Sequence, residues 1–115
     1  MGYILHVDNS GFFRKIMKTF LSELGMESES HTSGYDALNA VKTGEVTCVI
    51  TGLELPDMRG EDFIAQLLST GIPLPIIVFS ANEDENRNRY LESQGVIGIV
   101  LKSSNWKEVL RKFFV

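Results

Sequence analysis

Short apolar runs alternate along the chain with longer segments whose apolar residues recur every three or four positions. The longer period is typical of amphipathic helices, and short apolar runs rich in β-branched residues are typical of strands. Five strands are therefore predicted, at residues 3–7, 26–31, 46–51, 75–79 and 97–101. Five helices are predicted to follow them in turn, at residues 10–24, 33–42, 61–69, 82–94 and 104–114.

This regular alternation predicts an α/β fold with right-handed crossovers and a parallel five-stranded sheet. The polar, alternating segment 26–31 fits an edge strand. The other four strands are nearly continuous apolar runs, which suits strands covered by helices on both faces. In such sheets, binding sites form where the strands end at their carboxyl termini.

Several single positions carry their own expectations. Asn82 is predicted to cap the fourth helix, because acidic residues follow it in the first turn. Leu68 and Phe113 fall on the apolar stripes of their helices and are expected to face inward. His6 alternates with apolar neighbours, which favours a histidine of the core or sheet over a phosphoryl carrier or metal ligand. Cys48 lies in mid-strand and is expected to be a buried structural thiol.

Length and composition narrow the range of functions. The chain has 115 residues, which predicts one domain over residues 1–115, and its net charge is −4. A negative net charge argues against direct contact with nucleic acid. No apolar run approaches the roughly 20 residues that span a bilayer, so no membrane contact is expected. The single cysteine fits a reducing compartment, and we expect a cytoplasmic protein.

Polar or unusual residues stand at four of the predicted strand ends, namely Asp8-Asn9, Gly52, Ser80 and Lys102. The loop after the third strand reads Leu55-Pro56-Asp57-Met58-Arg59-Gly60. Together with segments 4–10, 34–38, 75–81 and 95–102, it resembles the response-regulator receiver domains of the chemotaxis-regulator type. The resemblance covers essentially the whole chain. It implies a flavodoxin-like three-layer (βα)5 sandwich with strand order 2-1-3-4-5, and a role in two-component phosphorelay signalling.

The resemblance also implies a chemistry for the pocket. In the family, two adjacent acids bind magnesium, an aspartate four residues before the loop proline accepts a phosphoryl group, and a hydroxyl and a lysine contact that group. Asp8, Ser80 and Lys102 match this pattern. Asn9 stands in place of the second acid, and Gly52 stands in place of the phosphoacceptor. A glycine has no side chain that could form an acyl phosphate.

Two further departures lie near the fifth strand. Ile99 occupies the position of an aromatic residue that often swings on activation in the family, and it remains a candidate switch position. Ser103 replaces a proline whose preceding peptide bond is often cis. Because a cis bond before a residue other than proline costs about 3 kcal/mol, a trans Lys102–Ser103 peptide and a shifted loop are predicted.

The loss of two acids changes the electrostatics of the pocket. A direct pair between Asp8 and Lys102 is expected, with Ser80 joined to it in one hydrogen-bonded cluster. Magnesium would then gain little from binding at Asp8. Glu54 is the only other nearby acid that could ligate a metal, and it is expected to face solvent. Asp57 lies beyond the proline and is not expected to replace the acceptor. No metal, cofactor or catalytic residue is therefore predicted.

The leading hypothesis is a non-enzymatic receiver that is not phosphorylated and that works through protein contacts. The expected partner is a signalling protein of the histidine kinase or output-domain class, and a homodimer is also open. The resemblance places the partner face on the fourth helix, the fifth strand and the fifth helix. Its candidate residues are Arg87, Tyr90, Ile99 and Trp106, although the spacing of Trp106 also suits the core.

Two alternatives remain. The parent protein could be a conventional phosphoreceiver in which Gly52 is a single Asp-to-Gly variant, although Asn9, Ile99 and Ser103 depart from the pattern as well. A weaker alternative is a flavodoxin-like nucleotide or flavin binder. That function needs a glycine- and hydroxyl-rich turn after the first strand. The segment 8–11 has some of those residues, but Asp8 would repel a phosphate.

Overall fold

Ten elements alternate regularly along residues 2–115, the part of the chain that the structure, a computed structural model, describes. The strands are β1 (Tyr3–Val7), β2 (Ser28–His31), β3 (Val46–Thr51), β4 (Ile76–Ser80) and β5 (Gly98–Leu101). The helices are α1 (Gly11–Glu23), α2 (Gly34–Val41), α3 (Gly60–Ser69), α4 (Glu85–Ser93) and α5 (Trp106–Phe114). The predicted order of elements is confirmed, with bounds that shift by a few residues.

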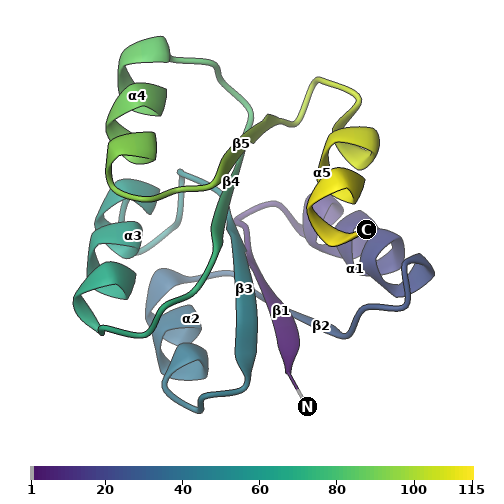
Figure 1. Ribbon diagram of the computed structural model, residues 1–115, viewed down its shortest axis with the longest axis horizontal. Coiled ribbons are helices and arrows are strands. Elements are labelled where there is room, and N and C mark those ends of the chain that lie inside the picture. The colour runs from purple at the N-terminus through teal and green to yellow at the C-terminus, as the bar shows by residue number, and fades with distance from the viewer. Residues whose placement is uncertain (1) are drawn as a thin grey trace.

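The strands form one parallel sheet in the order β2-β1-β3-β4-β5, as predicted. Helices α1 and α5 cover one face of this sheet, and α2, α3 and α4 cover the other (Figure 1). Strand β2 lies at an edge, which agrees with its polar sequence. The fold is thus the expected three-layer sandwich, and all five strands end at the same side of it.

Apolar side chains of β1, β3, β4 and β5 alternate between two apolar cores. In β1, Leu5 packs into the core under α2 and α3, while Ile4 packs into the core under α1 and α5. Aromatic side chains pack together in the second core. The centre of the Trp106 ring lies 5.4 Å from that of Phe20 and 5.2 Å from that of Phe79. Both cores therefore hold the strand ends in fixed positions.

Helix α4 begins three residues later than predicted, and the assignment of Asn82 as its cap was wrong. Asp84 is the cap, because its Oδ1 accepts from the amide of Arg87 at 3.1 Å. Asn82 lies in the preceding loop, where its amide donates to Ser80 Oγ at 3.2 Å and its carbonyl accepts from the same hydroxyl at 3.0 Å. This local pairing holds the Asn82 backbone outside the helix.

Two residues expected to face inward are exposed instead. Leu68 is 41% exposed, because the neighbouring Leu67 already fills the core on that side of α3. Phe113 is 39% exposed, because its ring lies across Gly98 on the edge strand β5, where any Cβ would collide with it. Phe114 packs against the second core instead.

Two other expectations are confirmed. No peptide bond among residues 2–115 is cis, so the Lys102–Ser103 bond is trans. His6 and Cys48 are both buried, and burial raises the pKa of the Cys48 thiol to about 11, so the thiol is unreactive. Within the same residues, no helix is both long and apolar enough to cross a membrane.

Candidate functional site

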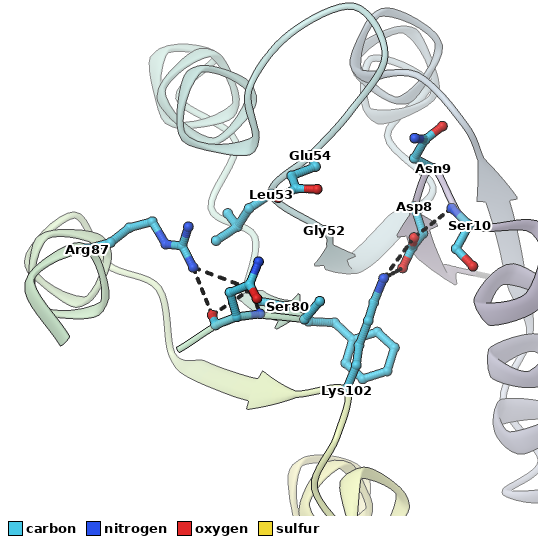
Figure 2. A pocket seen from close by; sticks show the side chains of 12 residues that line it. Asp8, Asn9, Ser10, Gly52, Leu53, Glu54, Ser80, Arg87 and Lys102 are labelled. Carbon is cyan, nitrogen blue, oxygen red and sulfur yellow. Dashed lines mark hydrogen bonds and ion pairs between the residues drawn. The ribbon is translucent and has the colours of Figure 1, made fainter. Parts of the chain in front are cut away.

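The predicted strand-end residues meet at one cavity of about 190 Å³. Asp8 and Asn9 lie at the end of β1, and Gly52 lies at the end of β3. Ser80 and Lys102 lie at the ends of β4 and β5 (Figure 2). Glu54 and Arg87 also line the cavity. The topology of the sheet, rather than proximity in sequence, assembles this group of residues.

Asp8 and Lys102 form the predicted ion pair. The Lys102 Nζ lies 2.9 Å from Asp8 Oδ2 and donates to Oδ1 at 3.1 Å (Figure 2). The Asp8 side chain is 3% exposed and that of Lys102 is 15% exposed. Burial acts to raise the pKa of Asp8, but contacts from His6, the Ser10 amide and Lys102 together hold that pKa below its usual value. The carboxylate is therefore ionised and paired with Lys102.

His6 lies beneath this pair, with its Nε2 3.5 Å from Asp8 Oδ2. Burial lowers the pKa of His6, so the ring is neutral at neutral pH. The sequence reasoning treated His6 as an isolated core residue and missed this contact. Side chains two positions apart on a strand share a face, and that rule already placed His6 beside Asp8.

Two aromatic rings fix the position of the lysine. The Lys102 Nζ lies 4.4 Å from the centre of the Phe13 ring and 5.5 Å from that of Phe79. Cation–π attraction and the Asp8 carboxylate therefore act on the same ammonium group. These contacts hold Lys102 on the Asp8 side of the cavity.

Gly52 is buried, and its backbone conformation does not require glycine. A Cβ there would lie 3.6 Å from the carbonyl oxygen of Val7 and 3.8 Å from both Asp8 Cγ and the carbonyl oxygen of Phe79. These are ordinary van der Waals distances, so a Cβ would fit. What is missing at this position is the nucleophile, not the room for one.

Ser80 belongs to a second group of contacts and not to the Asp8–Lys102 pair, contrary to the suggested single cluster. Its hydroxyl exchanges hydrogen bonds with the Asn82 backbone. Arg87 Nη2 donates to the Asn82 carbonyl at 2.9 Å and approaches Ser80 Oγ at 3.4 Å (Figure 2). Arg87 therefore brings a second cation to the cavity, which the sequence reasoning had assigned to a partner face.

The residues of the cavity do not fit a magnesium site. Asp8 is the only buried carboxylate there, and it is already paired with Lys102. Glu54 and Asn9 are exposed, as was expected for Glu54. No cluster of three or more His, Cys, Asp or Glu side chains that could hold a metal occurs within residues 2–115. One engaged carboxylate is too few oxygen ligands for Mg²⁺.

Asp57 has a structural role that the sequence did not predict. Its Oδ1 accepts from the amide of Gly34 and its Oδ2 from that of Tyr35, both at 2.9 Å. These bonds to the first turn of α2 lower the pKa of Asp57. This carboxylate ties the loop after β3 to α2 and lies outside the cavity.

The expected partner face needs correction at one of its four residues, Trp106. Trp106 is only 8% exposed and packs in the second core, so it offers no surface to a partner. Arg87 turns into the cavity. Tyr90 is exposed as expected, and Ile99 is half-buried against the first core.

Comparison with known proteins gives a consistent result. The family model described as "Response regulator receiver domain" matches residues 4–113. The sensor histidine kinase RcsC of Escherichia coli is 31% identical over 91 residues, a match that covers 78% of this chain and 10% of the kinase. The chemotaxis protein CheY-3 of Vibrio cholerae is 28% identical to this chain. The match covers 96% of this chain and 90% of CheY-3. The chain thus spans about a tenth of the kinase but nearly all of CheY-3.

Solved structures agree on the fold. The receiver domain of a LuxO repressor protein from Vibrio parahaemolyticus superposes with a TM-score of 0.90 at 21% identity, covering 97% of this chain and 86% of that one. The response regulator TrrA of Thermotoga maritima, solved in complex with Mg²⁺-BeF, gives a TM-score of 0.84 at 27% identity. The superposition covers 98% of this chain and 96% of TrrA.

Proposed function

Because the chain belongs to the response regulator receiver domain family, we propose that it is a two-component signalling module that works without phosphorylation. In this proposal its output comes from a fixed surface that binds a partner. The module is not an enzyme and needs neither magnesium nor another cofactor.

One observation carries the proposal. Gly52 leaves the acceptor position without a carboxylate, while Asp8, the remaining acid of the family pattern, is neutralised by Lys102 at 2.9 Å. Lys102 already neutralises the charge of the Asp8 carboxylate, as a bound metal ion would. The pocket thus has neither the group that attacks phosphorus nor a free buried carboxylate to place a metal beside it.

The partner class follows from the family and from the relatives. RcsC is a sensor histidine kinase and CheY-3 is a chemotaxis protein, so a kinase or an output domain is the proposed partner. The proposed contact surface includes Tyr90, which is 55% exposed, and Ile97, which is 53% exposed. We place this signalling in the cytoplasm.

Intact-mass measurement after incubation with acetyl phosphate and Mg²⁺ tests the proposal. We expect no increase in mass, because Gly52 leaves the acceptor position without a carboxylate and Asp8 is already paired with Lys102. A receiver domain that carries aspartate at the matching position serves as the control and should gain one phosphoryl group under the same conditions. An increase in this chain that hydroxylamine removes would reveal an acyl phosphate and overturn the proposal.

A further inference from the structure

Basic residues gather on one face of this acidic molecule. Helices α1 and α5, which cover the same face of the sheet, carry six basic and two acidic residues, a net charge of +4 (Figure 1). The basic residues are Arg14, Lys15, Lys18, Lys107, Arg111 and Lys112. The whole chain has 11 basic and 15 acidic residues, so the remainder carries five basic and 13 acidic residues, a net charge of −8.

The cations of this basic face are not neutralised within the chain. Among residues 2–115, no carboxylate lies within ion-pair distance of any of the six. Lys15, Arg111 and Lys112 are also exposed. The face therefore attracts a negatively charged surface.

An exposed aromatic side chain accompanies these charges at the start of α1. Phe12 is 67% exposed, and the neighbouring Phe13 ring meets it edge-on with the ring centres 5.2 Å apart. Phe12 lies three residues before Lys15, so both side chains lie on the same side of the helix. Aromatic residues are enriched in protein interfaces, and an exposed ring beside unpaired cations is suited to a protein contact.

A groove of about 440 Å³ lies on the side of the sheet that α3 and α4 cover. Its lining combines the half-buried apolar side chains of Leu55 and Met58 with the carboxylates of Glu54 and Glu61. Leu53, Asp57, Arg59 and Arg87 complete the lining. Within residues 2–115, neither Glu54 nor Glu61 has a cation within ion-pair distance.

The two arginines of this groove are already engaged. Arg59 Nε lies 3.6 Å from Asp62 Oδ2, and Arg87 Nη2 donates to the Asn82 carbonyl at 2.9 Å. The groove thus offers apolar surface beside two unpaired carboxylates. This is the complement of an aromatic ring with a lysine beside it.

We propose that the start of α1 in one copy of this chain docks into this groove of a second copy. Phe12 packs against the apolar lining, and Lys15 faces Glu54 and Glu61. The acidic surface that the basic face requires is thus present on the chain itself. The two copies use different surfaces, so the contact is heterologous, and each pair keeps a basic face and a groove for further copies. The inference goes beyond the proposed function, because it concerns contact between two copies and not phosphorylation.

Sedimentation equilibrium of the whole chain at about 50 mM NaCl tests the proposal, and we expect self-association with a Kd on the order of 100 µM. At about 500 mM NaCl the association should weaken by roughly tenfold, because salt screens exposed charges. Lys15→Glu and Glu61→Lys should each weaken it by roughly tenfold, because each places like charges together. Phe12→Ser should weaken it as well, because it removes the apolar anchor.

Mixing and matched variants separate this contact from general charge effects. An equimolar mixture of Lys15→Glu and Glu61→Lys chains should associate again, because the intact α1 of one meets the intact groove of the other. Lys42→Glu and Glu92→Lys make the same charge changes at exposed positions outside both surfaces, and they should leave the affinity unchanged.

A chain that stays monomeric up to about 1 mM at low salt would overturn the inference. So would Lys15→Glu and Glu61→Lys variants that associate as well as their matched controls. Neither result affects the proposed function, which is tested by covalent mass and does not depend on self-association.

Discussion

Replacing Lys102 with methionine is expected to lower the free energy of unfolding by about 3 kcal/mol, as is usual when one partner of a buried ion pair is removed. Methionine keeps the apolar stem beside Phe13 but leaves the Asp8 carboxylate buried without its cation. Urea denaturation at neutral pH measures the loss. Lys112→Met in the last turn of α5 is the matched control and should change stability by less than about 0.5 kcal/mol.

The pH dependence of this loss identifies its cause. The pKa of Asp8 is held below its usual value, so in the wild type the carboxylate stabilises the fold at neutral pH and loses this effect as pH falls through the folded pKa. Without Lys102 that pKa should rise, and the difference between variant and wild type should shrink below about pH 4.

A double variant tests the pair directly. Asp8→Asn combined with Lys102→Met removes both charges and should cost clearly less than the sum of the two single changes. Additive losses, or a Lys102→Met loss as small as that of Lys112→Met, would show that the pair does not stabilise the pocket.

Gly52→Asp is expected to enable the chain to accept a phosphoryl group. The position accepts a Cβ at ordinary contact distances, and the new carboxylate would lie beside Asp8, Ser80 and Lys102. Two neighbouring carboxylates repel each other, so the variant should lose about 1 kcal/mol of stability without metal and recover it with Mg²⁺. Intact mass after treatment with acetyl phosphate and Mg²⁺ measures the gain.

Gly52→Asn is the matched control, because it has the same shape but no nucleophilic oxygen, and it should gain no mass. Because Asn9 replaces an acid, the double variant Gly52→Asp with Asn9→Asp should react faster. If both aspartate variants fold and neither gains mass, the absence of an acceptor carboxylate at position 52 does not explain a lack of phosphorylation.

The fold was predictable because its evidence is local. Apolar periodicity marked most elements, and polar alternation marked the edge strand β2. Glycine at the helix ends was informative, since Gly25 and Gly95 both have positive φ. Helix bounds were less certain. Leu67 and Leu68 are adjacent apolar residues, and sequence alone does not decide which one turns to the core.

The candidate site was predictable where backbone topology decides it. Asp8, Gly52, Ser80 and Lys102 meet because parallel strands end at one edge, and the Asp8–Lys102 pair followed from charge alone. The position of Arg87 was not predictable, because a long side chain can turn to the surface or to the cavity from the same helix position. Its direction depends on the Asn82 carbonyl and Ser80, whose local geometry forms only in the folded chain.

The claim that Lys102 has replaced a metal ion as the partner of Asp8 is tested most directly by the stability of the wild type with and without Mg²⁺. Urea midpoints measured at constant ionic strength should be the same in the absence of Mg²⁺ and at about 10 mM Mg²⁺, because the Asp8 carboxylate is already paired. A site with a Kd of about 1 mM would instead raise the free energy of unfolding by about 1.4 kcal/mol. A rise of that size, lost in Asp8→Asn, would contradict the replacement of the metal by Lys102.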